Sequence, residues 1–175
     1  MNQFIVVDST QCIGCRTCEI ACATAHSPER TVSPATFSPR LKVVKTAMIT
    51  MPVLCRQCEN APCANACPAG AIVYQQNSVQ VRQSLCIGCK ACTLACPFGM
   101  ISVSIIGTAV ADTRPAAHYA TALKCDMCSG RSQGPACVEM CPTGALNVMR
   151  PEMLEHNQQQ KQRRVASGII SGLNI

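Results

Sequence analysis

The placement of its sixteen cysteines constrains this chain more than any other feature of the sequence. The cysteines form four groups, here called motifs one to four, with none left over. The motifs are Cys12, Cys15, Cys18 and Cys22; Cys55, Cys58, Cys63 and Cys67; Cys86, Cys89, Cys92 and Cys96; and Cys125, Cys128, Cys137 and Cys141. Motifs one and three read C-x2-C-x2-C-x3-C, and motifs two and four lengthen only the middle loop. Four complete motifs indicate four metal-binding sites.

The tight spacing is typical of iron–sulfur ligation. The first three thiolates of such a run lie on a loop that can wrap one corner of a cube. The fourth lies on a following helical turn and, in two-cluster ferredoxins, ligates the other cluster. Gly14 and Gly88 suit the loop because glycine bends there without steric cost. Proline follows the last cysteine in three motifs, as Pro68, Pro97 and Pro142. Sixteen thiolates therefore predict four [4Fe–4S] clusters.

Zinc and disulfides are the alternatives to iron–sulfur clusters. Structural zinc usually takes two separated C-x2-C pairs, whereas motifs one and three crowd three cysteines into seven residues. Disulfides need an oxidising compartment. The opening MNQFIVVDSTQC lacks the basic and long apolar regions of a secretory signal, and no stretch approaches the ~20 apolar residues of a membrane span. We therefore expect a cytoplasmic protein with reduced thiols.

Composition and charge agree with a core built around clusters. Aromatic residues make up only 3% of the chain, so a conventional core would be thin. The formal net charge of +6 counts thiols as neutral, and four oxidised clusters of about −2 each would bring it to about −2. The basic excess therefore indicates compensation for buried anions rather than nucleic-acid binding. No Ser–His–Asp set, phosphate loop or carboxylate pair indicates an enzyme.

Two pairings of the motifs are possible: neighbours along the chain, or a nested arrangement. Only 18 residues separate Cys67 from Cys86, and their alternating pattern around the turn QQN predicts a hairpin. The gaps on either side are longer, at 32 and 28 residues. This favours an α+β fold of two nested ferredoxin-like units with short strands and helices. We expect an inner unit over 50–106, an outer unit over 1–32 plus 107–150, and a connector over 33–49.

In the nested arrangement each fourth cysteine crosses to the partner motif, which defines four expected ligand sets. Set 1 is Cys12, Cys15, Cys18 and Cys141; set 2 is Cys22, Cys125, Cys128 and Cys137; set 3 is Cys55, Cys58, Cys63 and Cys96; set 4 is Cys67, Cys86, Cys89 and Cys92.

The segments outside the cysteine motifs are expected to form short strands, surface connections and a tail. Short strands are expected over 4–8, 41–45, 101–105 and 145–149, and surface connections over 23–50 and 107–124. We expect the segment 151–175 to be a partly helical C-terminal tail, which fits either a solvated helix face or a docking tail.

Four cations flank cluster ligands and would raise the reduction potential of a nearby cluster, unless solvent screens them. They are Arg16, Arg56, Lys90 and Lys124. The histidines His26, His118 and His156 are not needed as ligands.

The quoted motifs, with the stretches CRQCENAPCANACPAGAI and CIGCKACTLACPFG, resemble the four-cluster electron-transfer subunits of molybdenum oxidoreductases. The likeness is greatest to the small iron–sulfur proteins associated with formate dehydrogenase H and formate hydrogenlyase. It implies a non-catalytic relay of single electrons between a formate dehydrogenase and a hydrogenase or other redox partner. An accessory or assembly factor for a formate dehydrogenase is the alternative. Ala23 replaces the expected proline after Cys22.

Overall fold

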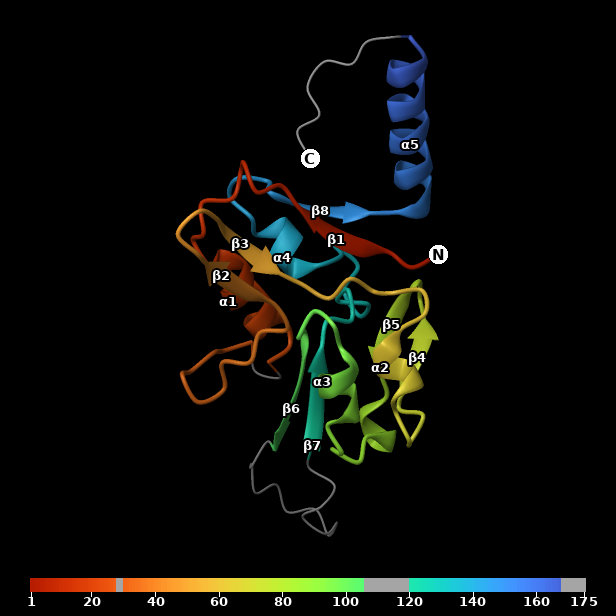
Figure 1. The fold of residues 1–175 in the computed structure, drawn as a ribbon. Helices are drawn as coiled ribbons and strands as arrows, with labels where there is room; N and C mark the ends of the chain where they lie inside the picture. The colour runs from red at the N-terminus through yellow and green to blue at the C-terminus, as the bar shows by residue number, and fades with distance from the viewer. Residues whose placement is uncertain (28–29, 106–119, 168–175) are drawn as a thin grey trace.

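The computed structural model describes residues 1–27, 30–105 and 120–167, and it has an α+β architecture of short elements (Figure 1). In chain order the elements are β1 (Phe4–Val7), α1 (Thr17–Ala25), β2 (Lys42–Lys45), β3 (Thr50–Val53), α2 (Pro62–Asn65), β4 (Ile72–Gln75), β5 (Ser78–Val81), the 3₁₀ turn η1 (Gln83–Leu85), α3 (Ala91–Ala95), β6 (Ile101–Ile105), β7 (Ala120–Lys124), α4 (Ala136–Glu139), β8 (Leu146–Met149) and α5 (Pro151–Ala166).

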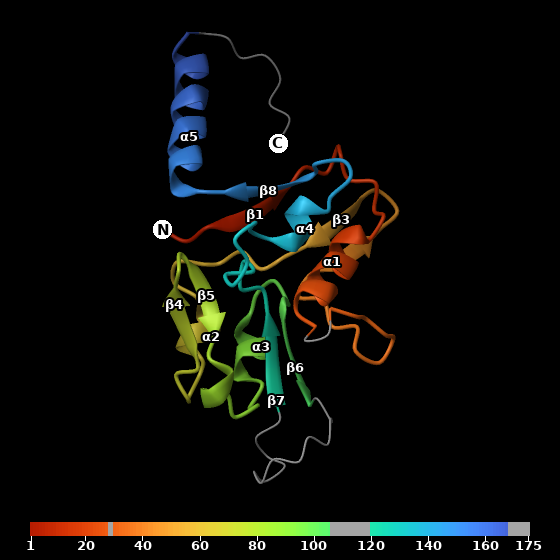
Figure 2. The ribbon, with the colours of Figure 1, turned by 180° about the vertical axis from the view of Figure 1, so that it is seen from behind.

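The described strands form four two-stranded antiparallel ladders, and one of them joins the two ends of the cysteine-rich region. β1 pairs with β8 in a register that sets Phe4 opposite Met149 and Val7 opposite Leu146. The other ladders are β2–β3, β4–β5 and β6–β7. Both views of the ribbon set β1 and β8 beside α1 and α4, while α2, α3 and the hairpins β4–β5 and β6–β7 make up the other half (Figures 1 and 2).

The four strands expected from sequence are confirmed to within a residue at each end, and so is the hairpin between motifs two and three. Its turn is made by Gln76 and Asn77, both with positive φ. A surface connection was expected over 107–124, and this is wrong for its last five residues, because 120–124 form the strand β7. Residues 107–119 lie outside the part of the chain that the structure describes. β3 was also missed, since Pro52 within it argues against a strand.

The core consists of small aliphatic side chains packed against sulfur. One cluster combines Ile5, Leu41 and Leu146 with Cys22 and Cys137. A second combines residues of motifs two and three with residues of β4, β5 and β6: Ala61, Cys63, Ile72, Val79, Cys92 and Ile101. No aromatic side chain belongs to either cluster in the described residues. Cysteine therefore contributes to the interior as an apolar residue even before any metal is considered.

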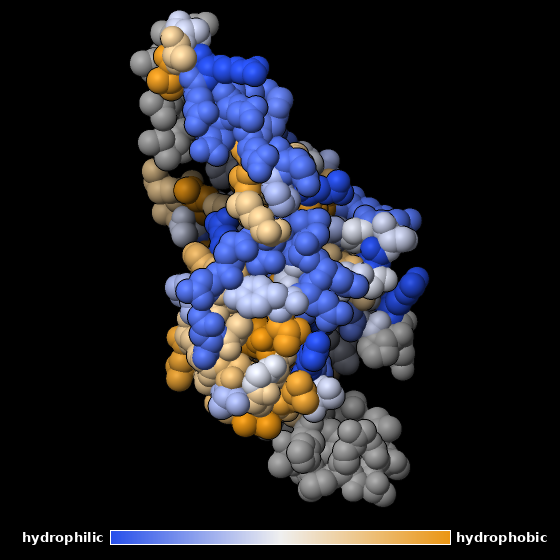
Figure 3. Space-filling view, turned by 90° about the vertical axis from the view of Figure 1, so that its right-hand side faces the viewer, coloured by the Kyte–Doolittle hydropathy of each residue, from blue (hydrophilic) through white to orange (hydrophobic). Residues whose placement is uncertain are grey.

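The C-terminal helix α5 stands apart from the rest of the molecule (Figure 1). Pro151 occupies its first turn, where a missing N–H costs nothing, and none of its residues is buried. Its surface is hydrophilic, whereas apolar side chains gather over the opposite half of the molecule (Figure 3). The expectation of a partly helical tail is thus met over 151–166. Within the described residues, no helix combines the length and apolar character needed to cross a membrane.

Two glycines let the tight loops of motifs one and three press against neighbouring hairpins. Gly14 and Gly88 have φ of +68° and +69°. A Cβ atom on Gly14 would lie 2.2 Å from Cγ2 of Thr50, and one on Gly88 would lie 2.2 Å from Cβ of Ala120. Each loop therefore needs glycine for both backbone conformation and space.

Replacement of Gly88 by alanine should destabilise the protein more than replacement of Gly144, which has φ of +65° but where an added Cβ would meet no atom within 4 Å. Gly144→Ala meets only left-handed strain of about 1–2 kcal/mol. Gly88→Ala adds a clash worth about 1–3 kcal/mol, because the Ala120 methyl group cannot rotate away. Anaerobic denaturant titration measures both variants. Equal losses would show that the contact with Ala120 does not constrain the loop.

Candidate metal centres

All four motifs share one backbone feature, a positive φ at the residue before the second cysteine. Gly14 and Gly88 hold this position in motifs one and three, and Gln57 (φ 49°) and Met127 (φ 58°) hold it in motifs two and four. Such a left-handed residue turns neighbouring N–H groups to one side of the loop and makes an anion-binding concavity. The motifs therefore present the same loop geometry, although only two carry glycine there.

The third cysteine of every motif lies in a helix rather than on the loop. Helices α1, α2, α3 and α4 contain Cys18, Cys63, Cys92 and Cys137, respectively, and all four side chains are buried. The sequence-based expectation placed the first three cysteines on the loop, so the helix begins one ligand earlier than expected.

The fourth cysteine follows the helix in motifs two, three and four, and not in motif one. In those three motifs the sequence C-P-x-G makes one turn. The N–H of Gly70, Gly99 or Gly144 donates to the carbonyl oxygen of the cysteine three residues earlier, at 3.2 Å in each case. Motif one lacks the proline, so α1 continues through Cys22 to Ala25. The presence or absence of proline thus decides whether the helix stops at the fourth ligand.

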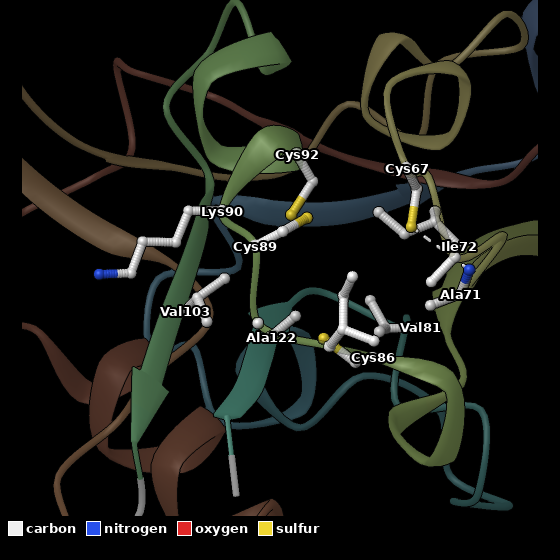
Figure 4. A pocket seen from close by; sticks show the side chains of 13 residues that line it. Cys67, Ala71, Ile72, Val81, Cys86, Cys89, Lys90, Cys92, Val103 and Ala122 are labelled. Atoms are coloured by element: carbon white, nitrogen blue, oxygen red, sulfur yellow. Dashed lines mark hydrogen bonds between the residues drawn. The ribbon is translucent and has the colours of Figure 1, made fainter. Parts of the chain in front are cut away.

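Three cavities are each lined by four cysteines that come from two different motifs. The first, with about 340 Å³ of empty space, is lined by Cys67, Cys86, Cys89 and Cys92. Figure 4 shows these four side chains converging on one space. A second cavity, of about 300 Å³, is lined by Cys55, Cys58, Cys63 and Cys96. A third, of about 320 Å³, is lined by Cys12, Cys15, Cys18 and Cys141.

The remaining cysteines gather where α1 packs against α4. Cys22 and Cys137 are buried there, and Cys125 packs against them. Burial raises the pKa of Cys137, and repulsion from Cys125, Cys22 and Cys128 raises it further. Beside this group lies an open groove with about 1340 Å³ of empty space, lined by Cys128 and by side chains of α1 and α4.

The thiols suit a cationic cofactor because they are crowded and buried. Burial raises the pKa of Cys18 and of Cys63 to about 11, and that of Cys125 to about 12. Neighbouring thiolates repel one another and oppose ionisation further: Cys55 and Cys96 act on Cys63, and Cys55 and Cys22 act on Cys125. Iron would supply the positive charge that ionised sulfurs need in such surroundings.

Backbone N–H groups are already directed at several sulfurs. Ala71 donates to Sγ of Cys67 at 3.3 Å, and Met100 donates to Sγ of Cys96 at 3.5 Å. For Cys22 the donor is the N–H of Arg40, at 3.3 Å, and Nε of the same arginine is buried without a partner among the described residues. These donors fit thiolate sulfur, so the residues present agree with [4Fe–4S] ligation.

A polar network beside motif four was not anticipated. Nε2 of His26 donates to Oδ1 of Asp126 at 3.1 Å, and Arg40 pairs with Oδ2 of Asp126 at 2.6 Å. Burial opposes protonation of His26, but its hydrogen bonds to Asp126 and Cys22 outweigh this and raise its pKa to about 9. The sequence signals were the position of His26, four residues after Cys22, and that of Asp126, between Cys125 and Cys128.

The four cations that flank cysteines differ in exposure. Arg16, Arg56 and Lys90 are exposed, and Arg16 lies 3.9 Å from Glu19. Lys90 lines the first cavity, but its ammonium points away from the sulfurs (Figure 4). Lys124, by contrast, is 3% exposed. His118 lies outside the described residues, and His156 is exposed on α5.

Comparisons with known proteins agree with this chemistry. Residues 46–150 match the family model of the 4Fe–4S dicluster domain. The electron transport protein HydN of Escherichia coli K12 is 45% identical over 172 residues, which cover 95% of this chain and 98% of that protein. Formate hydrogenlyase subunit 2 of the same organism is 42% identical, covering 85% and 82%. Hydrogenase-4 component A, also from that organism, is 36% identical, covering 98% and 94%.

Motif spacing, sulfur-lined cavities and relatives thus lead to one assignment. The sixteen cysteines match the ligands of four [4Fe–4S] clusters, and the chemistry of the chain is iron–sulfur electron transfer. The chain belongs to the 4Fe–4S dicluster-domain family, as a ferredoxin subunit of the formate hydrogenlyase type.

Proposed function

We propose that this protein relays single electrons between a formate dehydrogenase and a hydrogenase or similar acceptor, with four [4Fe–4S] clusters held by ligand sets 1 to 4. The observation that carries the ligand sets is the composition of the three cavities. Each is lined by three cysteines of one motif and the fourth cysteine of another, as in sets 4, 3 and 1. Set 2 is supported by packing, because Cys22 and Cys137 are buried in one core cluster and Cys125 packs against it.

The nested organisation is part of the same proposal. Pairing of β1 with β8 and packing of α1 on α4 support an outer unit built from motifs one and four. Packing of α2 on α3, with the hairpin β4–β5 beside them, supports an inner unit from motifs two and three. β6 pairs with β7 across the expected boundary between the inner and outer units at 106/107. We therefore assign β7 to the inner unit and start the second segment of the outer unit at Cys125.

The chain's own residues have three tasks in this function. Cysteine thiolates bind the iron, backbone N–H groups of Ala71, Met100 and Arg40 stabilise the anionic sulfurs, and small apolar side chains exclude water. When bound, the clusters supply one-electron redox chemistry. No substrate pocket is required of this chain, because reactants stay on its partners.

The relatives support the choice of partners. Two of them bear the names of a formate hydrogenlyase subunit and a hydrogenase component, which favours partners of that kind. A cytoplasmic location belongs to the same proposal, because cysteines clustered for metal binding need a compartment that keeps thiols reduced. An assembly role for a formate dehydrogenase is the second candidate.

The ligand sets can be tested with pairs of cysteine substitutions. In set 1, Cys12→Ala and Cys141→Ala should together remove one cluster, because both residues bind the same one. Cys128→Ala with Cys141→Ala should remove two, although these residues share a sequence motif. Electron paramagnetic resonance after dithionite reduction, integrated against chain concentration, counts the [4Fe–4S] clusters that remain.

The alternatives give different counts in this test. If each motif held its own cluster, the second pair would remove one cluster and the first pair two. If neighbouring motifs exchanged their fourth cysteines, both pairs would remove two. The wild-type protein should contain about sixteen iron atoms per chain.

The electron-transfer function predicts that formate reduces this protein only when the dehydrogenase is present. The oxidised protein, prepared anaerobically, is mixed with formate and catalytic amounts of formate dehydrogenase from the same cells. Visible absorption of the clusters should bleach, and added hydrogenase should restore it with release of hydrogen. Enzyme without formate is the control.

The assembly role predicts another outcome. A protein that stays oxidised with formate and enzyme, is still reducible by dithionite, and raises the activity of newly made dehydrogenase would contradict the relay and favour assembly.

A further inference from the structure

Lys124 is the one buried cation among the four that flank cysteines, and its surroundings are unusual for a lysine. It ends β7, directly before Cys125, and its ammonium donates to three oxygens. Nζ lies 3.1 Å from Oε1 of Gln57 and 3.1 Å from the carbonyl oxygen of Cys125, and it also donates to the carbonyl oxygen of Val79. All three acceptors are neutral. Among the described residues, no carboxylate forms an ion pair with Lys124.

A buried ammonium without a counter-ion is unfavourable, because neutral oxygens solvate the charge but do not neutralise it. The groups that could neutralise it are the cysteine thiolates on either side. Lys124 lines the cavity of set 3, formed by Cys55, Cys58, Cys63 and Cys96. Its other neighbour, Cys125, belongs to set 2. The position of Lys124 is therefore between two of the proposed clusters, at the junction of the inner and outer units.

Two contacts bring Lys124 next to both ligand sets. Its side chain lines the cavity of set 3, and its ammonium donates to the carbonyl oxygen of Cys125, a member of set 2.

Gln57 holds the ammonium in place. Its side chain is 2% exposed; Oε1 accepts from Lys124 and from the N–H of Val79 at 2.9 Å, while Nε2 donates to the carbonyl oxygen of Cys125 at 2.9 Å. The backbone carbonyl oxygen of Gln57 accepts from Nδ2 of Asn2 at 3.0 Å. One residue of motif two thus contacts motif four, the inner hairpin and the N-terminus, which leaves Lys124 little freedom to move.

We propose that Lys124 is an internal counter-charge that raises the reduction potential of the cluster held by set 3, and of its neighbour in set 2, above what their ligands alone would give. This inference rests on the proposed ligand sets. Adding an electron there makes the site more negative by one charge, and a fixed cation shielded from water stabilises that charge strongly. The exposed cations at the other cysteines are screened by solvent and salt, so they contribute much less.

The test compares Lys124→Met with Lys90→Met. Both changes remove one positive charge next to a cysteine ligand and keep an unbranched side chain, but only Lys124 is buried. Anaerobic redox titration monitored by electron paramagnetic resonance gives the midpoints of the clusters. Lys124→Met should lower at least one midpoint by about 59 mV or more, which is a tenfold change in the ratio of reduced to oxidised cluster. Lys90→Met should leave every midpoint within a small fraction of that shift.

A second variant tests the role of Lys124 if the Lys124→Met protein does not fold with its full set of clusters. Gln57→Glu keeps Lys124 and the size of its partner, but sets a carboxylate beside the ammonium. It should lower the same midpoint. If Lys124→Met or Gln57→Glu retains sixteen irons and its cluster midpoints are unchanged, the proposed role of Lys124 is overturned. A midpoint shift in Lys90→Met as large as that in Lys124→Met would also overturn it. A wild-type protein without sixteen irons would instead refute the ligand sets themselves.

Discussion

The burial of cysteine sulfurs in groups of four is the constraint on which the rest of the structure depends. Thiolates that lie together in an apolar interior repel one another, so the groups are stable only if they bind a cation or remain protonated. Neither core cluster of the described residues contains an aromatic side chain to compensate, and both include cysteine among their buried members. We therefore expect metal binding and folding to be coupled in this protein, as in other small metal-dependent domains.

The cysteine motifs and their cofactor were easier to predict from sequence than the surroundings of the motifs, for a physical reason. Ligand spacing within a motif is set by local loop geometry, which a few consecutive residues determine. The prolines after Cys67, Cys96 and Cys141 likewise act only on their own turn. By contrast, the buried state of Lys124 depends on Gln57 and Val79, which lie 67 and 45 residues away. No periodicity reports such a contact.

The same reasoning explains the two missed strands and the shared loop. β3 contains Pro52 and β7 reads ATALK, so neither has the alternation of a half-buried strand; each forms because its partner strand lies beside it. Positive φ at Gly14 and Gly88 was evident from glycine, but Gln57 and Met127 adopt it without that signal. Their conformation is imposed by the packing around them: Met127 is a buried member of a core cluster, and the side chain of Gln57 makes several buried hydrogen bonds.

Among the sixteen cysteines, only Cys15 and Cys89 are exposed, and both are the second ligand of a tight motif. One lines the cavity of set 1 and the other that of set 4. Molecular oxygen and peroxide reach these two sulfurs before any other. Aerobic damage should therefore start at these two sites and strip iron there first, while the sites whose sulfurs are all less exposed survive longer.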